Sequence, residues 1–474
     1  MHFSYDIIEK SGDVGGTWLD NTYPGVGCDV KSHLYSYSQL PNPAWSEAWS
    51  KGPEIMDYIR RISESVIHKV RFNTAVRKAV WKGDIVNKWA VELSNGETVM
   101  YDMIITATGT LHKPKTPNFK GMETYDGISF HTNRWNKDVD FSGKRVGIIG
   151  TGASAVQAVP RIAKMGVESL TVFQRTACWA PPQGNFQYPR FVIRLFSAIP
   201  ILQLLYRWYL FCSNEIIFFV LFMLPSKNVP IVGHIHSLVQ WAVRYWVKSH
   251  VMCSVNDPIT AEKLTPKFPL GCKRMTPSDL YLQSFNEDHV HLCTANIEEF
   301  NRSGITTIDG QKHELDVIIF ATGFDIISSI NAFEVKGLKG HKSLAECHGD
   351  TPLGYYGVSH HVCPNFFTIG GPGIVLGHNT VLFVGECQLN YIERGIESLL
   401  EKGAASLRLK ASAMRDYQVW ARKTSKNKVF EDAKHCTGWY RNDRGINWTF
   451  WPTNLVSFWW NTLRFDSQNY HYTY

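Results

Sequence analysis

The chain has 474 residues, enough for two or three domains, and its 44% hydrophobic and 19% charged residues are typical of a globular protein, not a disordered one. Its 49 basic and 42 acidic residues give a net charge of +7 without a basic block, so a nucleic-acid partner is not implied. Ten cysteines without a CxxC pair argue against a metal site or a disulfide framework and favour reduced thiols in the cytoplasm.

The first predicted element is a strand over residues 4–10, SYDIIEK, which carries Glu9 near its end. In a dinucleotide-binding fold, an acid that ends the second strand binds the adenosine ribose. The first strand and its glycine loop should then lie roughly 20 residues earlier, and this sequence does not contain them. We therefore expect a nucleotide-binding half that begins after its own phosphate loop.

Four further strands are predicted along the chain, each a run of Ile, Val or Phe that ends in glycine or polar residues: 102–110, 144–152, 169–176 and 315–325. Alternation of such strands with helical segments predicts an α/β fold with a mainly parallel sheet. The segment 114–141 is rich in Pro, Gly, Asn and Asp and resembles an interdomain connection. Because the ATG motifs near 107 and 321 are alike, we expect one domain to be split, with a second domain inserted into it.

The strand at 144–152 leads directly into a GxGxxA motif and then a helix. Gly150 permits the tight turn, Gly152 lets the backbone approach a pyrophosphate, and Ala155 lets the helix pack closely on the strand. The residues between them are Thr151, Ala153 and Ser154. This strand–turn–helix context predicts a complete dinucleotide-binding site.

The strand that follows ends in Arg175 and Thr176, where an NAD site usually has an acidic residue. A cation at this position suits a 2′-phosphate, so NADPH is favoured over NADH. The alternative is an ordinary surface arginine.

The apolar stretch 191–224 raises the question of a membrane. Arg194, Arg207 and Glu215 interrupt it, and its longest uncharged run, residues 195–206, is 12 residues long. A span needs about 20 predominantly apolar residues. We therefore predict buried or interfacial helices, and peripheral membrane contact stays open.

Several motifs together resemble those of the Baeyer–Villiger monooxygenases and related flavin-dependent monooxygenases. They are GGTW at 15–18, NTYPG at 21–25, CDVKSH at 28–33, GTGASAVQ at 150–157, FQRT at 173–176 and GCKR at 271–274. The identifying motif of that group is similar to the segment from Tyr125 to Asn136, which includes His131 and Trp135. This copy has Tyr and Asn where the family usually has Phe first and Pro or Asp last.

The resemblance implies two Rossmann-like domains, an FAD domain with an NADP domain inserted into it, and a helical subregion. It places the first part of the FAD domain at 1–140, the NADP domain at 141–305 with the helical subregion at 190–250, and the second FAD part at 306–474. The implied cofactors are FAD and NADPH, and the implied partners are O₂ and a small apolar substrate. No metal site is expected, since the histidines lack carboxylates or cysteines at ligand spacing.

The resemblance also implies the site residues. Arg274 matches the family's active-site arginine, and Asp29 matches the carboxylate that positions it. Lys273 would join Arg175 and Thr176 around the 2′-phosphate. The full cofactor-binding set is Glu9, Gly16, Thr17, Trp18, Asp29, Tyr35, Gly109, Gly150, Thr151, Gly152, Ala153, Ser154, Ala155, Gln157, Arg175, Thr176, Lys273, Arg274 and Gly323.

Two of these assignments have plainer alternatives. Without the resemblance, Lys273 and Arg274 would be a solvated surface pair, and Gly109 and Gly323 ordinary glycines at strand ends. His131 and Trp135 are expected to couple domain movement to turnover, and no proton transfer is assigned to His131. The C-terminal aromatic residues, Trp439, Tyr440, Trp448, Trp451, Trp459 and Trp460, either line a substrate tunnel or, more commonly, pack the terminal segment.

The implied reaction is reduction of FAD by NADPH, followed by oxygenation of an apolar ketone to an ester or lactone. Oxygenation of a nitrogen or sulfur centre is the first alternative. A catalytically impaired remnant is the second, because FAD binding without the glycine loop is expected to be poor. The location is expected to be cytoplasmic, with membrane association open, and the oligomeric state is not specified.

Overall fold

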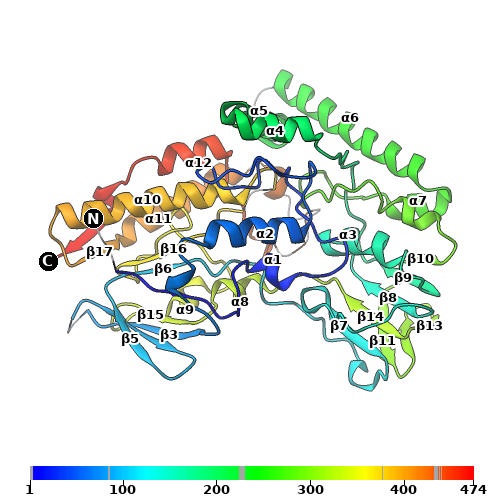
Figure 1. The fold of residues 1–474 in the computed structure, drawn as a ribbon, viewed down its shortest axis with the longest axis horizontal. Coiled ribbons are helices and arrows are strands. Elements are labelled where there is room, and N and C mark those ends of the chain that lie inside the picture. The colour runs from blue at the N-terminus through cyan, green and yellow to red at the C-terminus, as the bar shows by residue number, and fades with distance from the viewer. Residues whose placement is uncertain are drawn as a thin grey trace.

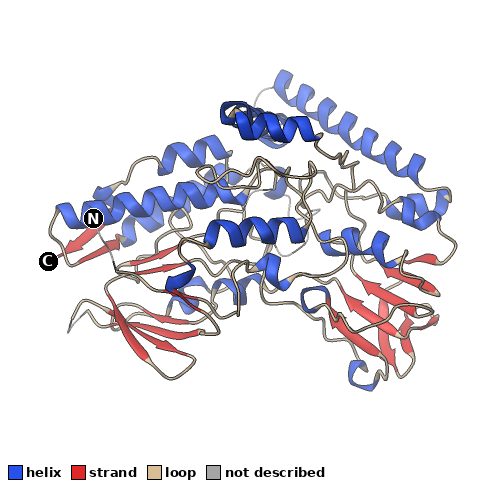
Figure 2. Ribbon diagram, in the orientation of Figure 1, coloured by secondary structure: helices blue, strands red, loops and turns tan. Residues whose placement is uncertain are grey.

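The computed structural model describes residues 4–83, 86–223, 230–375, 377–426, 428–431, 436, 438, 440–442 and 444–474. Two sheet-containing regions lie at opposite ends of the molecule, with helices above and between them (Figures 1 and 2). The N- and C-terminal ends of the described chain lie near each other on the side opposite the inserted nucleotide-binding sheet (Figure 1).

The inserted region is built on a five-stranded parallel sheet with the order β10-β9-β8-β14-β7. Its strands are β7 (Ile128–His131), β8 (Arg145–Ile149), β9 (Ser169–Phe173), β10 (Val290–Cys293) and β14 (Val317–Phe320). Helix α3 (Ala153–Ile162) follows β8 and packs apolar side chains on the sheet; Ile148, Val156, Ile162 and Leu170 are fully buried there. Buried parallel strands explain why β8, β9 and β14 are nearly continuous apolar runs.

Two strands of this sheet come from outside the range 141–305 predicted for the domain. β14 pairs with β8 in the register Val317↔Val146, and β7 pairs with the other edge of β14. The residues of β14 are all buried, so the strand needs a central place with neighbours on both edges. The segment 114–141, predicted as an interdomain connection, therefore contains β7, which is an edge strand of this sheet. The predicted domain boundaries remain a prediction.

The other sheet-containing region holds two parallel pairs and a mixed four-stranded sheet. The pairs are β1 (Ile7–Ile8) with β2 (Val70–Arg71), and β6 (Ile104–Thr106) with β16 (Phe366–Thr368). The sheet has the order β15 (Glu334–Lys336), β3 (Val76–Trp81), β4 (Trp89–Leu93), β5 (Thr98–Tyr101). In it, β15 pairs with β3 in parallel and the other pairs are antiparallel. Within the described residues the two parallel pairs are not joined to each other. The expected lack of a first strand and glycine loop stays a prediction.

Helices α10 (Val381–Glu401), α11 (Ala411–Ser425) and α12 (Leu455–Thr462) form the C-terminal region with the antiparallel pair β17 (Ser406–Leu409) and β18 (Tyr470–Thr473). Trp448 and Trp451 are buried, which supports the packing interpretation for these two residues. Trp459 and Trp460 are exposed, and Trp439 lies outside the described residues.

The predicted helical subregion consists of α4 (Arg190–Ala198), α5 (Pro200–Phe218), the π-helical turn η4 (Phe219–Met223) and α6 (Pro230–Ser254), which lie along one edge of the molecule (Figure 1). Residues Pro200–Phe222 form one helix long and apolar enough to cross a membrane, judged by length and composition alone. Only 28% of its most apolar window is buried, so it is not an ordinary core helix.

Shorter elements connect these units. The remaining α-helices are α1 (Thr17–Asp20), α2 (Gly52–Ser63), α7 (Pro258–Leu264), α8 (Ile326–Ile330) and α9 (Leu344–His348). A small antiparallel sheet beside the inserted region contains β11 (Ile297–Asn301), β12 (Gly304–Thr307) and β13 (Lys312–Glu314). The 3₁₀ turns are η1 (Ile67–Lys69), η2 (Met122–Thr124), η3 (Thr132–Arg134), η5 (Gln283–Asn286), η6 (Val429–Glu431) and η7 (Ser467–Asn469).

Candidate cofactor and active site

The turn between β8 and α3 has the geometry of a phosphate-binding turn. Gly150 adopts a φ of +115°, and a Cβ atom there would lie 2.4 Å from the carbonyl oxygen of Ala321, so only glycine fits. Gly152 caps α3, and the space beside it is open. Ala155 is fully buried, which lets the helix lie close to the sheet. The N–H groups at the N-terminus of a ten-residue helix therefore face open space, which suits a pyrophosphate.

The residues around this turn are fixed by the neighbouring strand. The Thr151 hydroxyl donates to the carbonyl oxygen of Thr176 at 2.6 Å, which joins the turn to the end of β9. Ala153 and Ser154 form the first turn of α3. The predicted nucleotide-binding residues of this segment thus lie together at one end of the sheet.

Two cations lie near the end of β9. Arg175 is exposed two residues after the strand ends, and Lys273 is half-buried in the GCKR loop. Burial lowers the pKa of Lys273, and the positive charge of Arg175 lowers it further, so the two side chains are close enough to interact. Within the described residues neither makes an ion pair, and an anion between them would relieve their repulsion. This arrangement suits a 2′-phosphate.

Gln157, predicted to contact a cofactor, joins the two regions of the protein. Its side-chain amide donates to the carbonyl oxygen of Gly27 at 2.9 Å, and its oxygen accepts a hydrogen bond from the Tyr23 hydroxyl at 2.8 Å. Its side chain thus orients the loop that precedes Asp29. A direct cofactor contact stays a prediction.

Asp29 and Arg274 form a bidentate ion pair between segments 245 residues apart in sequence. One terminal guanidinium nitrogen donates to Oδ1 of Asp29 at 2.7 Å, and Nε donates to Oδ2. Both side chains retain about a quarter of their exposure, 26% for Asp29 and 27% for Arg274. Burial disfavours the guanidinium charge, but Asp29 more than offsets this effect, so the pKa of Arg274 is raised. The pair therefore provides a permanently charged cation of fixed orientation.

The backbone on each side holds this pair in place. The Cys28 N–H donates to the carbonyl oxygen of Ser50 at 3.0 Å, which ties the Asp29 loop to the segment before α2. The Thr276 N–H donates to the carbonyl oxygen of Trp179 at 2.9 Å, which ties the Arg274 loop to the nucleotide-binding region. The ion pair thus lies where the two regions of the protein meet.

Neutral groups lie beside the pair: Cys28 is buried, and Tyr35 and Trp18 are partly buried. Burial raises the pKa of the Cys28 thiol and of the Tyr35 hydroxyl, so both are protonated at neutral pH. The Tyr35 hydroxyl accepts a hydrogen bond from Nε1 of Trp18 at 3.1 Å, and the two rings meet edge to face. Trp18 and Tyr35 therefore pack together as an uncharged pair. The charged groups of the site are Asp29 and Arg274.

The remaining predicted residues lie at separate places in the fold. Glu9 follows β1, and its carboxylate accepts a hydrogen bond from the Ser11 N–H at 2.7 Å. Gly16 caps the short helix that begins with Thr17. Gly109 and Gly323 both adopt positive φ angles, +74° and +81°, with open space where a Cβ would lie.

Gly323 and His131 mark the crossing between the regions. The Gly323 carbonyl oxygen accepts a hydrogen bond from the Lys115 N–H at 2.9 Å. Nδ1 of His131 accepts a hydrogen bond from the Asn133 N–H at 3.0 Å, which caps η3. Burial lowers the pKa of His131 to about 4, so it is neutral at pH 7. Trp135 stacks on Phe141 with ring centroids 5.6 Å apart. These contacts give His131 a structural role, and we assign it no role in proton transfer.

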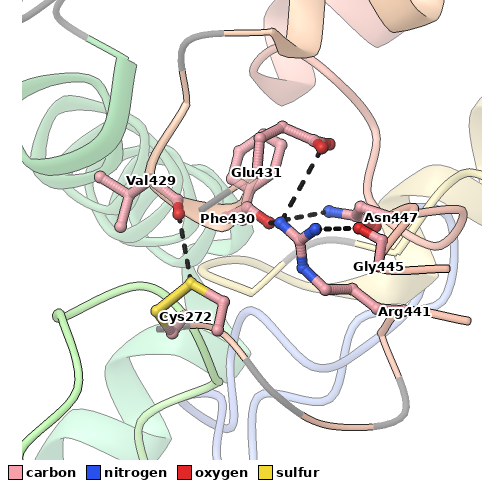
Figure 3. The surroundings of a disulfide bond; sticks show 8 residues. Cys272, Val429, Phe430, Glu431, Arg441, Gly445 and Asn447 are labelled. Atoms are coloured by element: carbon pink, nitrogen blue, oxygen red, sulfur yellow. Dashed lines mark hydrogen bonds and ion pairs between the residues drawn. A yellow bond between two sulfur atoms is a disulfide. The ribbon is translucent and has the colours of Figure 1, made fainter. Parts of the chain in front are cut away.

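A disulfide between Cys272 and Cys436 joins the GCKR loop to the C-terminal segment (Figure 3). The expectation of only reduced thiols is therefore wrong for this pair. The two cysteines are 164 residues apart, so no spacing in the sequence could have paired them. Arg441 stabilises the C-terminal side of the crosslink by donating to the carbonyl oxygens of Phe430 and Gly445.

Tyr440 is a site residue whose contact the sequence did not reveal. Its hydroxyl accepts a hydrogen bond from the backbone N–H of Arg274 at 3.4 Å. The C-terminal segment thus contacts the Arg274 loop twice, through Tyr440 and through the disulfide. Among the residues that the structure describes, no group of three or more His, Cys, Asp or Glu side chains could hold a metal ion.

The fold and the site together define an oxidoreductase with two dinucleotide-binding regions. The family described as "pyridine nucleotide-disulphide oxidoreductase" matches residues 30–198. A Baeyer–Villiger monooxygenase of Streptomyces coelicolor is 32% identical over 475 residues, covering 98% of this chain and 87% of that protein. A Baeyer–Villiger monooxygenase of Pseudomonas aeruginosa is also 32% identical, over 98% of this chain and 86% of that protein.

Solved structures of related monooxygenases have the same fold. An oxidised steroid monooxygenase bound to NADP has a TM-score of 0.84 at 26% identity, covering 99% of this chain and 94% of that one. A crystal structure of OTEMO in complex with FAD and NADP has a TM-score of 0.84 at 27% identity, covering 98% of this chain and 94% of that one. The chain belongs to the Baeyer–Villiger monooxygenase family and is a flavin-dependent monooxygenase. The predicted family, fold class and enzyme class are confirmed.

Proposed function

We propose that this protein uses FAD, NADPH and O₂ to insert one oxygen atom into an apolar ketone, giving an ester or lactone. The observation that carries the proposal is the bidentate Asp29–Arg274 pair at the junction of the two regions. NADPH supplies a hydride, and bound FAD supplies the redox chemistry that activates O₂. Negative charge develops on oxygen during attack on a carbonyl, and a fixed cation lowers the energy of that charge.

Different residues of the chain would stabilise the developing charge, limit water access and bind NADPH. Arg274 holds its charge at any working pH, and Asp29 fixes the plane of its guanidinium. The buried Cys28 and the partly buried Tyr35 and Trp18 limit the access of water to the pair, which strengthens its electrostatic effect. The open N-terminus of α3 fits the pyrophosphate of NADPH, and Arg175, Thr176 and Lys273 fit its 2′-phosphate.

The first test is Arg274→Ala in the cofactor-loaded protein. The variant should lose ester formation by about 10²–10³-fold, because the loss of one stabilising donor in an oxyanion site has that cost. Remaining NADPH oxidation should release hydrogen peroxide in place of ester. Arg274→Lys, which keeps the charge but loses the two-point contact with Asp29, should recover part of the product yield. An unchanged yield in the Ala variant would show that another group stabilises the charge.

Product analysis separates the ketone proposal from the oxygenation of soft heteroatoms. A cyclic ketone and a thioether are offered separately to the wild-type protein, and lactone and sulfoxide are quantified by chromatography. Because attack on a carbonyl builds an oxyanion and sulfur oxidation does not, Arg274→Ala should reduce lactone formation more than sulfoxide formation. Sulfoxide as the sole product of the wild-type protein would contradict the ketone proposal.

A further inference from the structure

Helix α5 has an inverted arrangement of polar and apolar side chains. Its buried positions recur at helical spacing and carry Gln203, Arg207, Leu210, Glu215 and Phe218. Three of these five are polar or charged, which is unusual for the buried face of a helix. Each of the three therefore needs partners in the body of the protein.

Those partners are present along the whole length of α5. Gln203 donates to the carbonyl oxygen of Asn42 at 2.8 Å. Arg207 donates to the carbonyl oxygen of His33 and to the Ser36 hydroxyl, both at 2.9 Å. Polar bonds therefore fix the face that α5 turns toward the protein.

The C-terminal half of α5 is held in the same way. Oε1 of Glu215 lies 2.7 Å from Nε2 of His378 and accepts a hydrogen bond from the Asn379 amide at 2.9 Å, while Oε2 accepts from the Leu455 N–H at 3.0 Å. A helix bound along both halves cannot rotate its apolar face inward. The apolar face must therefore point away from the protein.

The outward face of α5 is almost wholly apolar. Its exposed side chains include Trp208 at 60%, Tyr209 at 65% and Ile216 at 63% exposure. The other exposed apolar residues of this helix are Ile201, Leu204, Leu205 and Ile217. Contiguous apolar patches of more than a few hundred Å² are rare on monomeric proteins and mark interaction sites.

The neighbouring helices also expose apolar side chains. α4 exposes Phe191 and Leu195, and α6 exposes Leu238, Trp241, Tyr245 and Trp246. The rings of Trp241 and Tyr245 stack with centroids 5.6 Å apart. α4, α5 and α6 lie together along one edge of the molecule (Figure 1). We call the exposed side chains of these three helices the apolar edge.

The charged residues of this region are almost all basic. Glu215 is the single acidic residue between positions 190 and 254, and it is buried in the contacts described above. Arg190, Arg194, Arg244 and Lys248 are exposed. Within the described residues Arg190, Arg194 and Arg244 form no ion pair, and Lys248 lies 3.8 Å from Glu262. The apolar edge is therefore flanked by positive charge.

We infer that the apolar edge seats the protein on the surface of an anionic lipid bilayer, with α4, α5 and α6 lying in the plane of the interface. Apolar side chains for the acyl boundary, Trp and Tyr for the headgroup level and basic residues for anionic lipids are the combination that such a surface requires. A second copy fits less well, because pairing two such edges would bring Arg190, Arg194 and Arg244 of each copy together. The bonds of Gln203, Arg207 and Glu215 to the protein body favour lying in the interface over spanning the bilayer.

Vesicle co-sedimentation of the full chain tests this inference. Binding to vesicles of phosphatidylcholine mixed with phosphatidylglycerol should exceed binding to phosphatidylcholine alone by at least about tenfold, and should weaken as salt is raised. The double variant Trp208→Glu, Ile217→Glu should abolish sedimentation with both. Ile308→Glu, at an apolar position of 63% exposure outside the three helices, should bind like the wild type.

Charge variants separate the electrostatic part of the binding. Arg190→Glu with Arg244→Glu should remove the preference for anionic lipid, whereas Lys164→Glu with Arg302→Glu, at exposed positions outside the three helices, should retain it. Equal binding by all variants, or no binding to anionic vesicles, would overturn the inference. So would a wild-type dimer that the double variant Trp208→Glu, Ile217→Glu converts to monomer in sedimentation velocity without lipid. These readouts need no turnover, so they are independent of the proposed reaction.

Discussion

Arg274 owes its position to contacts on three sides. Asp29 holds its guanidinium, Tyr440 contacts its backbone N–H, and the disulfide at Cys272 fixes the residue two positions before it. A partly buried ion pair of this kind fixes the orientation of the arginine more than it stabilises the fold, because the free-energy cost of desolvating the two charges offsets much of their attraction. An arginine suits this position better than a lysine, because its two-point contact fixes a plane.

Arg175→Ala should weaken binding of NADPH by about 10–100-fold, since one charge-assisted contact contributes about 1.5–3 kcal/mol. Binding of NADH should change little, because NADH lacks the 2′-phosphate. Steady-state kinetics and direct binding with both nucleotides measure the two effects. Lys273→Ala should show the same selectivity, whereas Lys164→Ala, at an exposed position outside the site, should show none. Equal losses with NADPH and NADH would contradict a 2′-phosphate contact.

At the scale of elements, the C-terminal segment and the GCKR loop behave as one unit. Cys436→Ser should lower the free energy of unfolding by about 2–5 kcal/mol, because the crosslink closes a long loop of the unfolded chain. Urea unfolding with and without a dithiol reductant measures the loss, and the reductant should have no effect on the variant. Cys253→Ser, which removes an exposed free cysteine, is the matched control. Thiol titration of the unfolded, unreduced wild type should find eight free thiols, and ten would show that the disulfide is absent.

Glu215 joins α5 to the segment before α10 and to the start of α12. Glu215→Ala should reduce the free energy of unfolding by about 2–4 kcal/mol, because it leaves the Asn379 amide and the Leu455 N–H without their buried acceptor. Chemical denaturation measures the change. Glu397→Ala, at an exposed position on α10, should fall within about 0.5 kcal/mol of the wild type. A wild-type value for Glu215→Ala would show that the helix is held by other contacts.

For the whole molecule, acid should destabilise the fold before the carboxylates are protonated. The pKa of His33, His131 and His348 is lowered from 6.5 to about 4, mainly by burial and at His33 also by the positive charge of Arg207. The unfolded chain therefore takes up protons first, so the stability from these residues is complete above about pH 6.5 and is lost toward pH 4. At pH 5 the loss should be about 1–2 kcal/mol for each histidine.

Glu431 acts in the opposite direction. Burial raises its pKa to about 7 despite Arg441, so ionisation at neutral pH destabilises the fold and falling pH relieves that cost. The stability gained when Glu431 is protonated offsets the loss from about one histidine. The net change in the free energy of unfolding at pH 5 is therefore still a decrease. Urea unfolding at pH 7 and pH 5 measures it, and Glu431→Gln should make the loss larger. Equal stability at the two pH values would contradict the prediction.

The local signatures in the sequence predicted much of the fold and part of the site. The residues of the GxGxxA turn from Gly150 to Ala155 are contiguous in sequence, and the positive φ of Gly150 belongs to the local backbone of the turn. The strand predicted within 315–325 is β14. It could be predicted because a continuous apolar run indicates a buried strand whichever strands lie beside it. The resemblance indicated Asp29 and Arg274 together, and the tertiary structure places them within hydrogen-bond distance.

Only the tertiary structure decided which distant residues meet. The sheet to which β14 belongs, the Cys272–Cys436 pair and the contact of Tyr440 with Arg274 all depend on the path of the chain between them. The same holds for α5, whose sequence shows apolar residues interrupted by Arg207 and Glu215 but not which face turns inward. Hydrogen-bond partners near His33 and Asn379 decide that, because a buried charge must lie where its partners are. The sequence determined the local backbone geometry, and the packing of remote segments determined the site's contacts and the exposed apolar edge.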